Sequence, residues 1–195
     1  MEKFTVHTGT AAPLKRSNVD TDQIIPARFC VHSTRTGHAA SLFADWREDP
    51  TFVLNRPEHH QATILVAGND FGTGSSREYA VWALQDHGFR AVVAPRFGDI
   101  FRGNALMNGL LTVTAPPHVV ETLWNLIDAD PTTPLTVDLH HRQLRCEDLV
   151  HPIDIDDDTR TRLLQGLDPI AATLQHAPDI TAYEHHRRPA LPHTH

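Results

Sequence analysis

The chain has 195 residues, a formal net charge of −7 at neutral pH and two cysteines. Its length predicts one domain with a sizeable core, and its acidic balance, without a basic stripe, argues against a surface that follows a nucleic-acid backbone. No segment reads as a secretory signal or a membrane span, and the cysteines are too few for a disulfide framework, so we expect a cytoplasmic protein that binds neither membranes nor nucleic acid.

Strands are predicted where short apolar runs rich in β-branched residues are bounded by turn residues, at residues 4–6, 23–25, 64–67, 91–94 and 111–114. Helical patterns predict helices at residues 79–87, 97–107, 119–127 and 158–165. Gly88 and Gly166 are the expected stop residues of two of these helices, and Asp158 is the expected cap of the last. Residues 135–139 and 143–146 are expected to form a hairpin. Strands that alternate with helices predict an α/β fold with parallel strand pairing.

The most informative stretch is residues 68–78, where a glycine-punctuated turn joins a predicted buried strand to a predicted helix. A helix N-terminus leaves backbone N–H groups unpaired and carries partial positive charge. Gly72 and Gly74 would let the backbone approach a ligand closely. The turn is therefore a candidate anion-binding site.

Ser75, Ser76 and Arg77 stand at the start of that helix, and their spacing leaves two interpretations open. Ser75 followed three residues later by Glu78 fits a capping box. Arg77, however, opposes the helix dipole by ~0.3–1 kcal/mol at an exposed site, whereas a guanidinium beside two hydroxyls is well suited to a carboxylate or phosphate. The stretch is neither a Walker P-loop nor a dinucleotide fingerprint, because it lacks the lysine of the first and the glycine spacing of the second.

Residues 70–78 resemble the signature of the swivel domain of the aconitase superfamily, and further motifs narrow the resemblance to the small subunits of 3-isopropylmalate dehydratase. These motifs run through nearly the whole chain, at residues 18–26, 34–37, 52–55, 96–104, 109–111, 166–170 and 173–176. The resemblance implies a single swivelling β/β/α domain, which we assign to residues 1–180. Residues 181–195 are histidine-rich and interrupted by proline, and we expect a loose C-terminal tail there.

The resemblance also implies a hydro-lyase that isomerises 2-isopropylmalate to 3-isopropylmalate by dehydration and rehydration in leucine biosynthesis. The family's [4Fe–4S] cluster is held in a separate large subunit, so this chain is expected to hold no metal or cofactor and to be active only with that partner. Carried over to this sequence, Ser75 would be the catalytic base, acting as an alkoxide, while Ser76 and Arg77 would hold the substrate carboxylate. Asp22 would orient a group of the large subunit, or would serve only as a turn or cap residue.

Substrate binding is expected from Gly72 and Gly74 and from the segment between Pro26 and Gly37. In the family this segment contacts the side chain of the malate derivative. On that ground we expect the following residues to contact the substrate: Phe29, Val31, His32, Thr34 and Arg35.

The sequence departs from the family pattern in two places. Residues 29–33 lack the basic pair that many isopropylmalate enzymes carry, and Tyr79 stands where histidine is usual. These departures leave two alternatives open, namely the small subunit of a related 2-alkylmalate isomerase, such as a benzylmalate-type enzyme of a specialised pathway, and a non-catalytic anion-binding module. Drift in a variable loop would explain the first departure equally well.

Overall fold

The computed structural model describes residues 1–31 and 34–187. Its parallel sheet has the order β2-β4-β6-β7, with strands β2 (Ala11–Leu14), β4 (Ile64–Ala67), β6 (Ala91–Ala94) and β7 (Leu111–Thr114). Its antiparallel sheet has the order β1-β8-β9-β10, with strands β1 (Val6–Gly9), β8 (Leu135–Asp138), β9 (Gln143–Cys146) and β10 (Leu149–Pro152). A further parallel pair joins β3 (Val19–Asp20) to β5 (Phe71–Thr73).

Seven α-helices are present in the described residues, together with short 3₁₀ turns between residues 27 and 59. The helices are α1 (Thr21–Ile24), α2 (Glu78–His87), α3 (Asp99–Asn108), α4 (Pro117–Ala129), α5 (Asp157–Gln165), α6 (Pro169–Leu174) and α7 (Ala177–His186).

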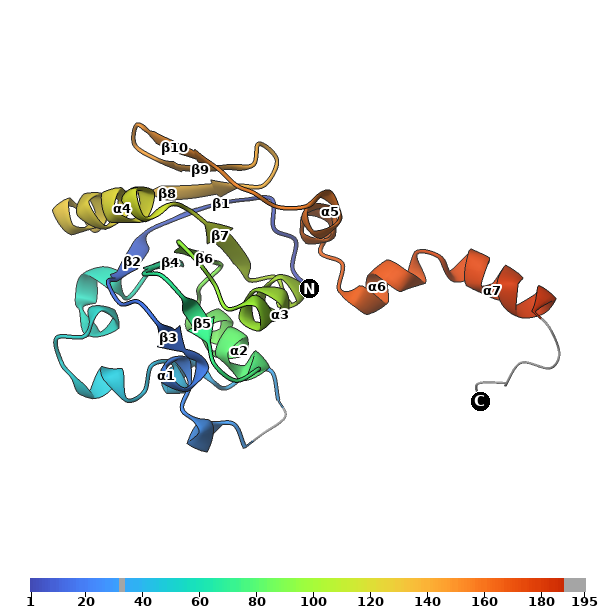
Figure 1. The fold of residues 1–195 in the computed structure, drawn as a ribbon, viewed down its shortest axis with the longest axis horizontal. Coiled ribbons are helices and arrows are strands. Elements are labelled where there is room, and N and C mark those ends of the chain that lie inside the picture. Colours follow the sequence, from blue (N-terminus) through green and yellow to red (C-terminus); the bar gives the residue numbers. More distant parts are fainter. Residues whose placement is uncertain (32–33, 188–195) are drawn as a thin grey trace.

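The parallel sheet lies between two apolar cores, because successive side chains of a strand point to opposite faces. On one face Val66 and Val93 pack with the antiparallel sheet and α4. On the other face Leu65 and Val92 pack with α2 and α3. The result is a sheet on a sheet with helices on the far side (Figure 1), which confirms the predicted β/β/α architecture and the parallel pairing.

Most predicted elements after residue 60 are confirmed. The strands at 64–67, 91–94 and 111–114 are β4, β6 and β7, and the predicted hairpin is β8 with β9. Gly88 and Gly166 end α2 and α5 with φ of +113° and +72°, a backbone conformation that glycine adopts without a β-carbon penalty. The cap of α5 is Asp156, two residues before the predicted one.

The N-terminal predictions need correction. The strand expected at 4–6 begins at Val6, and β2 was not predicted because Pro13 stands inside it. Residues 23–25, expected as a strand, belong largely to the single helical turn α1. Asp20 forces this turn, because its side chain accepts from the Gln23 backbone while the Gln23 side chain accepts from the Asp20 backbone.

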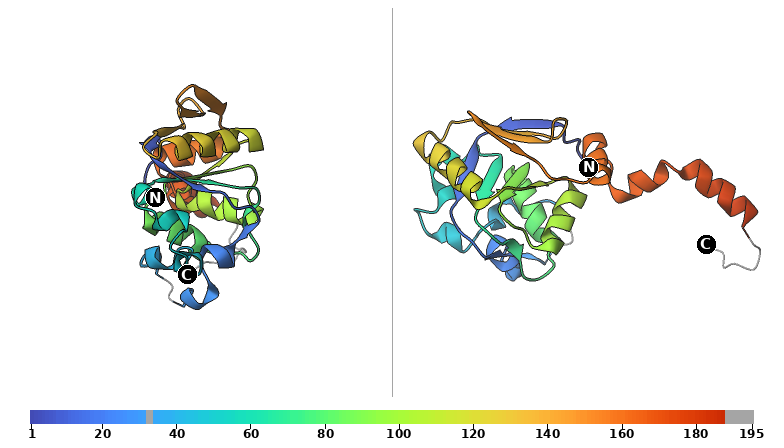
Figure 2. Two further views of the ribbon diagram at one scale, coloured as in Figure 1. Left: turned by 90° about the vertical axis from the view of Figure 1, so that its left-hand side faces the viewer. Right: turned by 45° about the horizontal axis from the view of Figure 1, so that its top comes forward.

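The C-terminal arm, α6 and α7, extends away from the two sheets (Figures 1 and 2) and buries none of its side chains. Residues 181–186 of the expected loose tail are helical, as part of α7, and residues 188–195 lie outside the described residues. In the described part of the chain, no helix is both long enough and apolar enough to cross a membrane.

His87 gives the fold a predicted pH dependence. Burial, with the nearby charge of Arg47, lowers its pKa to about 4. Below an unfolded pKa of about 6.5 the unfolded chain takes up a proton that the folded chain refuses. Stability should therefore fall by about 1–2 kcal/mol as the pH drops from 7 to 5, after discounting for partial solvent screening.

Urea unfolding at both pH values measures this difference. In the variant His87→Gln the difference in stability between pH 7 and pH 5 should be much smaller. The difference that remains should come from His7 and His59, because burial lowers their pKa values as well. An unchanged difference in the variant would contradict the assignment.

Candidate active site

The stretch 68–78 runs from the end of β4 through β5 to the first residue of α2. Gly72 and Gly74 have φ of +75° and +85° within it. A β-carbon on Gly72 would lie 2.3 Å from Cγ of the buried Phe101, so the backbone passes α3 where no side chain fits. Residues 74–77, here called the serine turn, are thereby held between β5 and α2.

Replacing Gly72 with alanine should lower the free energy of unfolding by about 2–4 kcal/mol, because the added carbon overpacks Phe101 and the left-handed backbone penalises it. Gly103→Ala is the matched control, since a β-carbon added to this helical glycine of α3 would have nothing within 4 Å of it. The control should raise stability by roughly 0.5–1 kcal/mol. Urea titration measures both, and equal effects of the two changes would contradict the packing argument.

Strand β3 and helix α1 bring a carboxylate to the serine turn. β3 pairs with β5, and the Asp20 cap then turns the chain into α1. Thr21 Oγ1 donates to the Ser75 carbonyl oxygen at 2.9 Å, which ties α1 to the turn. Asp22 then accepts a hydrogen bond from the Arg77 guanidinium. The observed partner of Asp22 is thus Arg77 of the same chain.

The Asp22–Arg77 pair is charged at neutral pH. The hydrogen bond from Arg77 holds the pKa of Asp22 below its usual range, and the same bond raises the pKa of Arg77. The Arg77 side chain is 22% exposed and that of Asp22 is 54% exposed, so the pair lies at an open edge. A guanidinium has five donors, so Arg77 can bind a ligand carboxylate while it stays paired with Asp22.

Ser75 and Ser76 are exposed beside this pair. Neither hydroxyl forms a hydrogen bond within the described part of the chain. Arg77 is the N-cap of α2, and among the described residues no side chain caps that helix, so of the two interpretations the capping box of Ser75 and Glu78 is wrong. The Ala80 N–H donates to the Arg77 carbonyl oxygen, which leaves the N–H groups of Glu78 and Tyr79 and the two hydroxyls available to an anion.

The segment upstream of α2 lies partly beside this edge. Phe29 is half-buried against the core and Arg28 lies over its ring at 4.7 Å, whereas Val31 is 69% exposed. Burial raises the pKa of the Cys30 thiol, and the charges of Arg77 and Asp22 also act on it, which shows that Cys30 lies near the pair. His32 lies outside the described residues.

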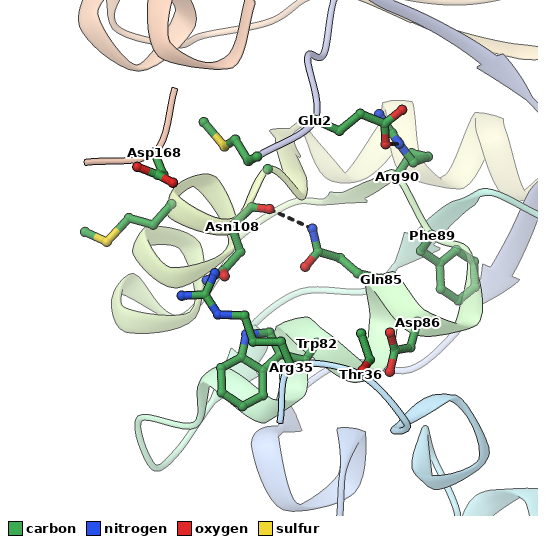
Figure 3. A pocket seen from close by; sticks show the side chains of 13 residues that line it. Glu2, Arg35, Thr36, Trp82, Gln85, Asp86, Phe89, Arg90, Asn108 and Asp168 are labelled. Atoms are coloured by element: carbon green, nitrogen blue, oxygen red, sulfur yellow. Dashed lines mark hydrogen bonds and ion pairs between the residues drawn. The ribbon is translucent and has the colours of Figure 1, made fainter. Parts of the chain in front are cut away.

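Arg35 lines a different part of the surface from the serine turn. It contributes to a pocket of about 320 Å³ together with Trp82, Gln85 and Asn108 (Figure 3). None of the described residues that line this pocket belongs to the serine turn. Thr34 is exposed nearby, and its hydroxyl donates to the Thr36 carbonyl oxygen. The structure therefore brings Asp22 to the serine turn but does not bring Arg35 there.

Two residues near the site were not predicted to take part in it. His38 is 4% exposed and contacts the rings of Tyr79 and Trp82. Tyr79, the departure from the family pattern, has its ring 4.8 Å from that of Trp82. A single histidine between a glycine and two alanines carries no sequence signal of burial, whereas the unusual tyrosine indicated that the surroundings of α2 differ from the family pattern.

Metal-ligating side chains do not gather into a site in the described structure. Over residues 1–31 and 34–187, no cluster of three or more histidine, cysteine, aspartate or glutamate side chains is arranged to hold a metal ion. Cys30 and Cys146 are both free thiols.

Comparisons with known proteins agree with this architecture. The family model of the aconitase C-terminal domain matches residues 1–118, and that of the C-terminal domain of the 3-isopropylmalate dehydratase small subunit matches residues 170–193. A crystal structure of 3-isopropylmalate dehydratase from Methanocaldococcus jannaschii has the same fold, with a TM-score of 0.65 at 24% identity over 92% of this chain and 99% of that one.

Curated relatives match nearly end to end. The 3-isopropylmalate dehydratase small subunit of Acidothermus cellulolyticus is 64% identical over 190 residues, which cover 97% of this chain and 96% of the relative. That of Thermobifida fusca is 60% identical over 192 residues, which cover 98% of each. With its β/β/α fold and its serine turn, the chain belongs to the family of 3-isopropylmalate dehydratase small subunits within the aconitase superfamily.

Proposed function

We propose that the serine turn is the proton-transferring half of an active site whose other half lies on a large subunit, and that the two subunits interconvert 2-isopropylmalate and 3-isopropylmalate in leucine biosynthesis. The observation that carries this proposal is the meeting of two free hydroxyls, the Asp22–Arg77 pair and an uncapped helix N-terminus at one exposed edge. Because the edge is open to solvent, a second protein surface is needed to exclude water from the reaction.

The dehydration breaks a C–H bond beside a carboxylate and a C–OH bond on the neighbouring carbon. The base keeps the C–H proton, and the hydroxide leaves as water with a second proton that the half of the site on the large subunit supplies. Rehydration of the alkene diacid adds a proton and hydroxide back in the other orientation. Ser75 takes the proton in the first step and returns it in the second. A serine alkoxide is far too basic to exist unaided, so Arg77 and the first-turn N–H groups of α2 must stabilise it.

Ser76 and Arg77 bind the carboxylate next to the acidic C–H bond, on which negative charge develops as the proton leaves. Gly72 and Gly74 keep the backbone close enough for its N–H groups to take part. Asp22 orients the Arg77 guanidinium through their ion pair. This is a more local role than the contact with the large subunit that the resemblance implies.

We assign the family's [4Fe–4S] cluster to the large subunit, where it would supply the Lewis acid that a hydroxide leaving group needs. This chain's own residues bind the carboxylate and carry the proton. We also propose that the protein is cytoplasmic, as expected from the sequence.

We propose that the segment between Pro26 and Gly37 selects the substrate by contact with its side chain. The residues of this segment expected to make that contact are Phe29, Val31, His32, Thr34 and Arg35. Val31 is an apolar side chain that is 69% exposed, which suits contact with an alkyl group of the substrate. The same exposed valine supports a second candidate, a related 2-alkylmalate isomerase with a different alkyl group.

Turnover of isopropyl-, benzyl- and methyl-substituted malates by the assembled complex tests both candidates, with the absorbance of the unsaturated diacid as the readout. Turnover of the isopropyl compound alone supports leucine biosynthesis. Preference for another alkyl group supports the second candidate, and a complex that binds the malates but turns over none would support the anion-binding module.

A further inference from the structure

His38 joins the downstream end of the substrate-binding segment to helix α2. Its Nε2 donates to the Thr34 carbonyl oxygen at 2.8 Å, and its backbone N–H donates to Asp86 Oδ2 at 2.8 Å. Its ring meets Tyr79 edge-on at 5.4 Å and stacks on Trp82 at 6.0 Å. With 4% of its surface exposed, His38 has its polar bonds shielded from competition with water.

The ring partners of His38 connect the serine turn with the pocket that Arg35 lines. Tyr79 lies two residues after Arg77 in the first turn of α2. Trp82, one turn further along, lines the same pocket as Arg35 and Thr36 (Figure 3). The histidine therefore connects the helix that begins at the serine turn with the residues that precede His38 in the chain.

Arg35 has no short-range polar partner. In the described part of the chain its guanidinium forms no ion pair within 4 Å and no hydrogen bond, and its charge acts at longer range on Asp168, which lines the same pocket. The backbone of residues 34–37 therefore decides where Arg35 stands. The bond from the His38 ring to the Thr34 carbonyl oxygen closes this backbone onto His38, and the bond from the His38 backbone N–H to Asp86, together with the ring contacts, holds His38 on α2.

We propose that His38 is a positioning residue, which anchors residues 34–37 to α2 and so sets where Arg35 stands relative to the serine turn. The proposal rests on the proposed function, in which Arg35 binds the substrate. His59 provides a contrast, because it is equally buried at 4% exposure while its Nδ1 has no partner among the described residues. His59 therefore serves as the matched control for the general cost of changing a buried histidine.

A double-mutant cycle in the assembled complex tests the proposal. His38→Phe keeps a ring for the stacking contacts but removes the bond to Thr34, and Arg35→Ala removes the group to be positioned. Each single change should raise KM for 2-isopropylmalate about tenfold with kcat within about twofold, as loss of uniform substrate binding does. The double variant should be no worse than the worse single variant, because His38 acts through Arg35. KM effects that multiply would overturn the proposal.

His38→Gln is the conservative variant, since its amide can still donate to the Thr34 carbonyl oxygen. It should keep KM within about threefold of the wild type. His59→Phe should leave KM unchanged even where it lowers thermal stability. An equal rise in KM for His59→Phe would mean that any loss of stability has this effect, and would overturn the specific role of His38.

A readout without catalysis separates this proposal from the proposed function. Trypsin cleavage after Arg35 reports local opening of the segment, and His38→Phe should accelerate it about tenfold while His59→Phe does not. An unchanged cleavage rate would overturn the anchor. If the wild-type complex resists trypsin but does not turn over 2-isopropylmalate, the proposed function is contradicted. The comparison of trypsin cleavage rates between the variants still decides the role of His38 in that case.

Discussion

Replacing Ser75 with alanine is expected to lower kcat of the assembled complex by about 10³-fold or more, with KM within about threefold. The hydroxyl is the base of the proposed reaction. In that proposal Ser76 is engaged with the substrate carboxylate, and Arg77 is permanently protonated and cannot take a proton. Ser75 lies in an exposed turn and its hydroxyl has no partner in the described structure, so its loss leaves the fold intact. Steady-state kinetics on 2-isopropylmalate measures the effect.

Ser17→Ala is the matched control for Ser75→Ala. Ser17 is also exposed, and its hydroxyl accepts a hydrogen bond from the Asn69 backbone at 3.1 Å, so the change tests a neighbouring turn without touching the site. We expect kcat within about twofold of the wild type for this variant. A Ser75→Ala complex as active as the Ser17→Ala complex would remove Ser75 from the mechanism.

Replacing Arg77 with alanine is expected to lower kcat/KM by about 10²–10³-fold, through both a higher KM and a lower kcat. The guanidinium binds the substrate carboxylate and stabilises the charge that develops on it, so both ground state and transition state lose the contact. Arg77→Lys should recover only part of the loss, because a single ammonium cannot replace a planar fork of donors. Removing Arg77 should also return the pKa of Asp22 toward its ordinary value, since the hydrogen bond from Arg77 is the main cause of the lowered pKa.

Arg142→Ala is the control for Arg77→Ala. Arg142 also pairs with an aspartate, Asp157, at a solvated position, and exposed pairs of this kind contribute about 0–1 kcal/mol to stability. The variant should keep kcat/KM within about twofold. A loss at Arg142 equal to that at Arg77 would point to a general effect of charge and would contradict the local role.

The sequence predicts the central part of the fold well because its signals are local. The strands at 64–67 and 91–94 are buried throughout and read as continuous apolar runs, as strands covered on both faces do. The strand at 111–114 is buried except at Thr114 and is marked by β-branched residues. Gly88 ends α2 because the backbone there is left-handed, and the glycine alone is enough to predict the end of the helix.

The N-terminal region could not be predicted in the same way, because competing local bonds decide it. Residues 23–25 carry the composition of a strand, but the reciprocal bonds between Asp20 and Gln23 close a helical turn instead. Strand β2 contains Pro13, which argues against a strand in the middle of a sheet and is tolerated at the edge that β2 forms.

The site shows the same division between local and long-range signals. The serine turn follows from glycine spacing and motif, all within eleven residues of sequence. The Asp22–Arg77 pair joins residues 55 positions apart, and the contact between Gly72 and Phe101 depends on how α3 packs against β5. The bond from His38 to Asp86 likewise spans 48 positions. Such contacts depend on tertiary packing and leave no periodic pattern in a single sequence.

The most direct test of the proposed reaction is an absorbance assay for the unsaturated diacid from 2-isopropylmalate. It would compare the purified chain alone, the large subunit alone, and the two proteins co-expressed without oxygen. We expect activity only in the co-expressed complex, and its loss with Ser75→Ala. Activity of the large subunit alone, or full activity of the Ser75→Ala complex, would contradict the claim that this chain supplies the proton-transferring half of the active site.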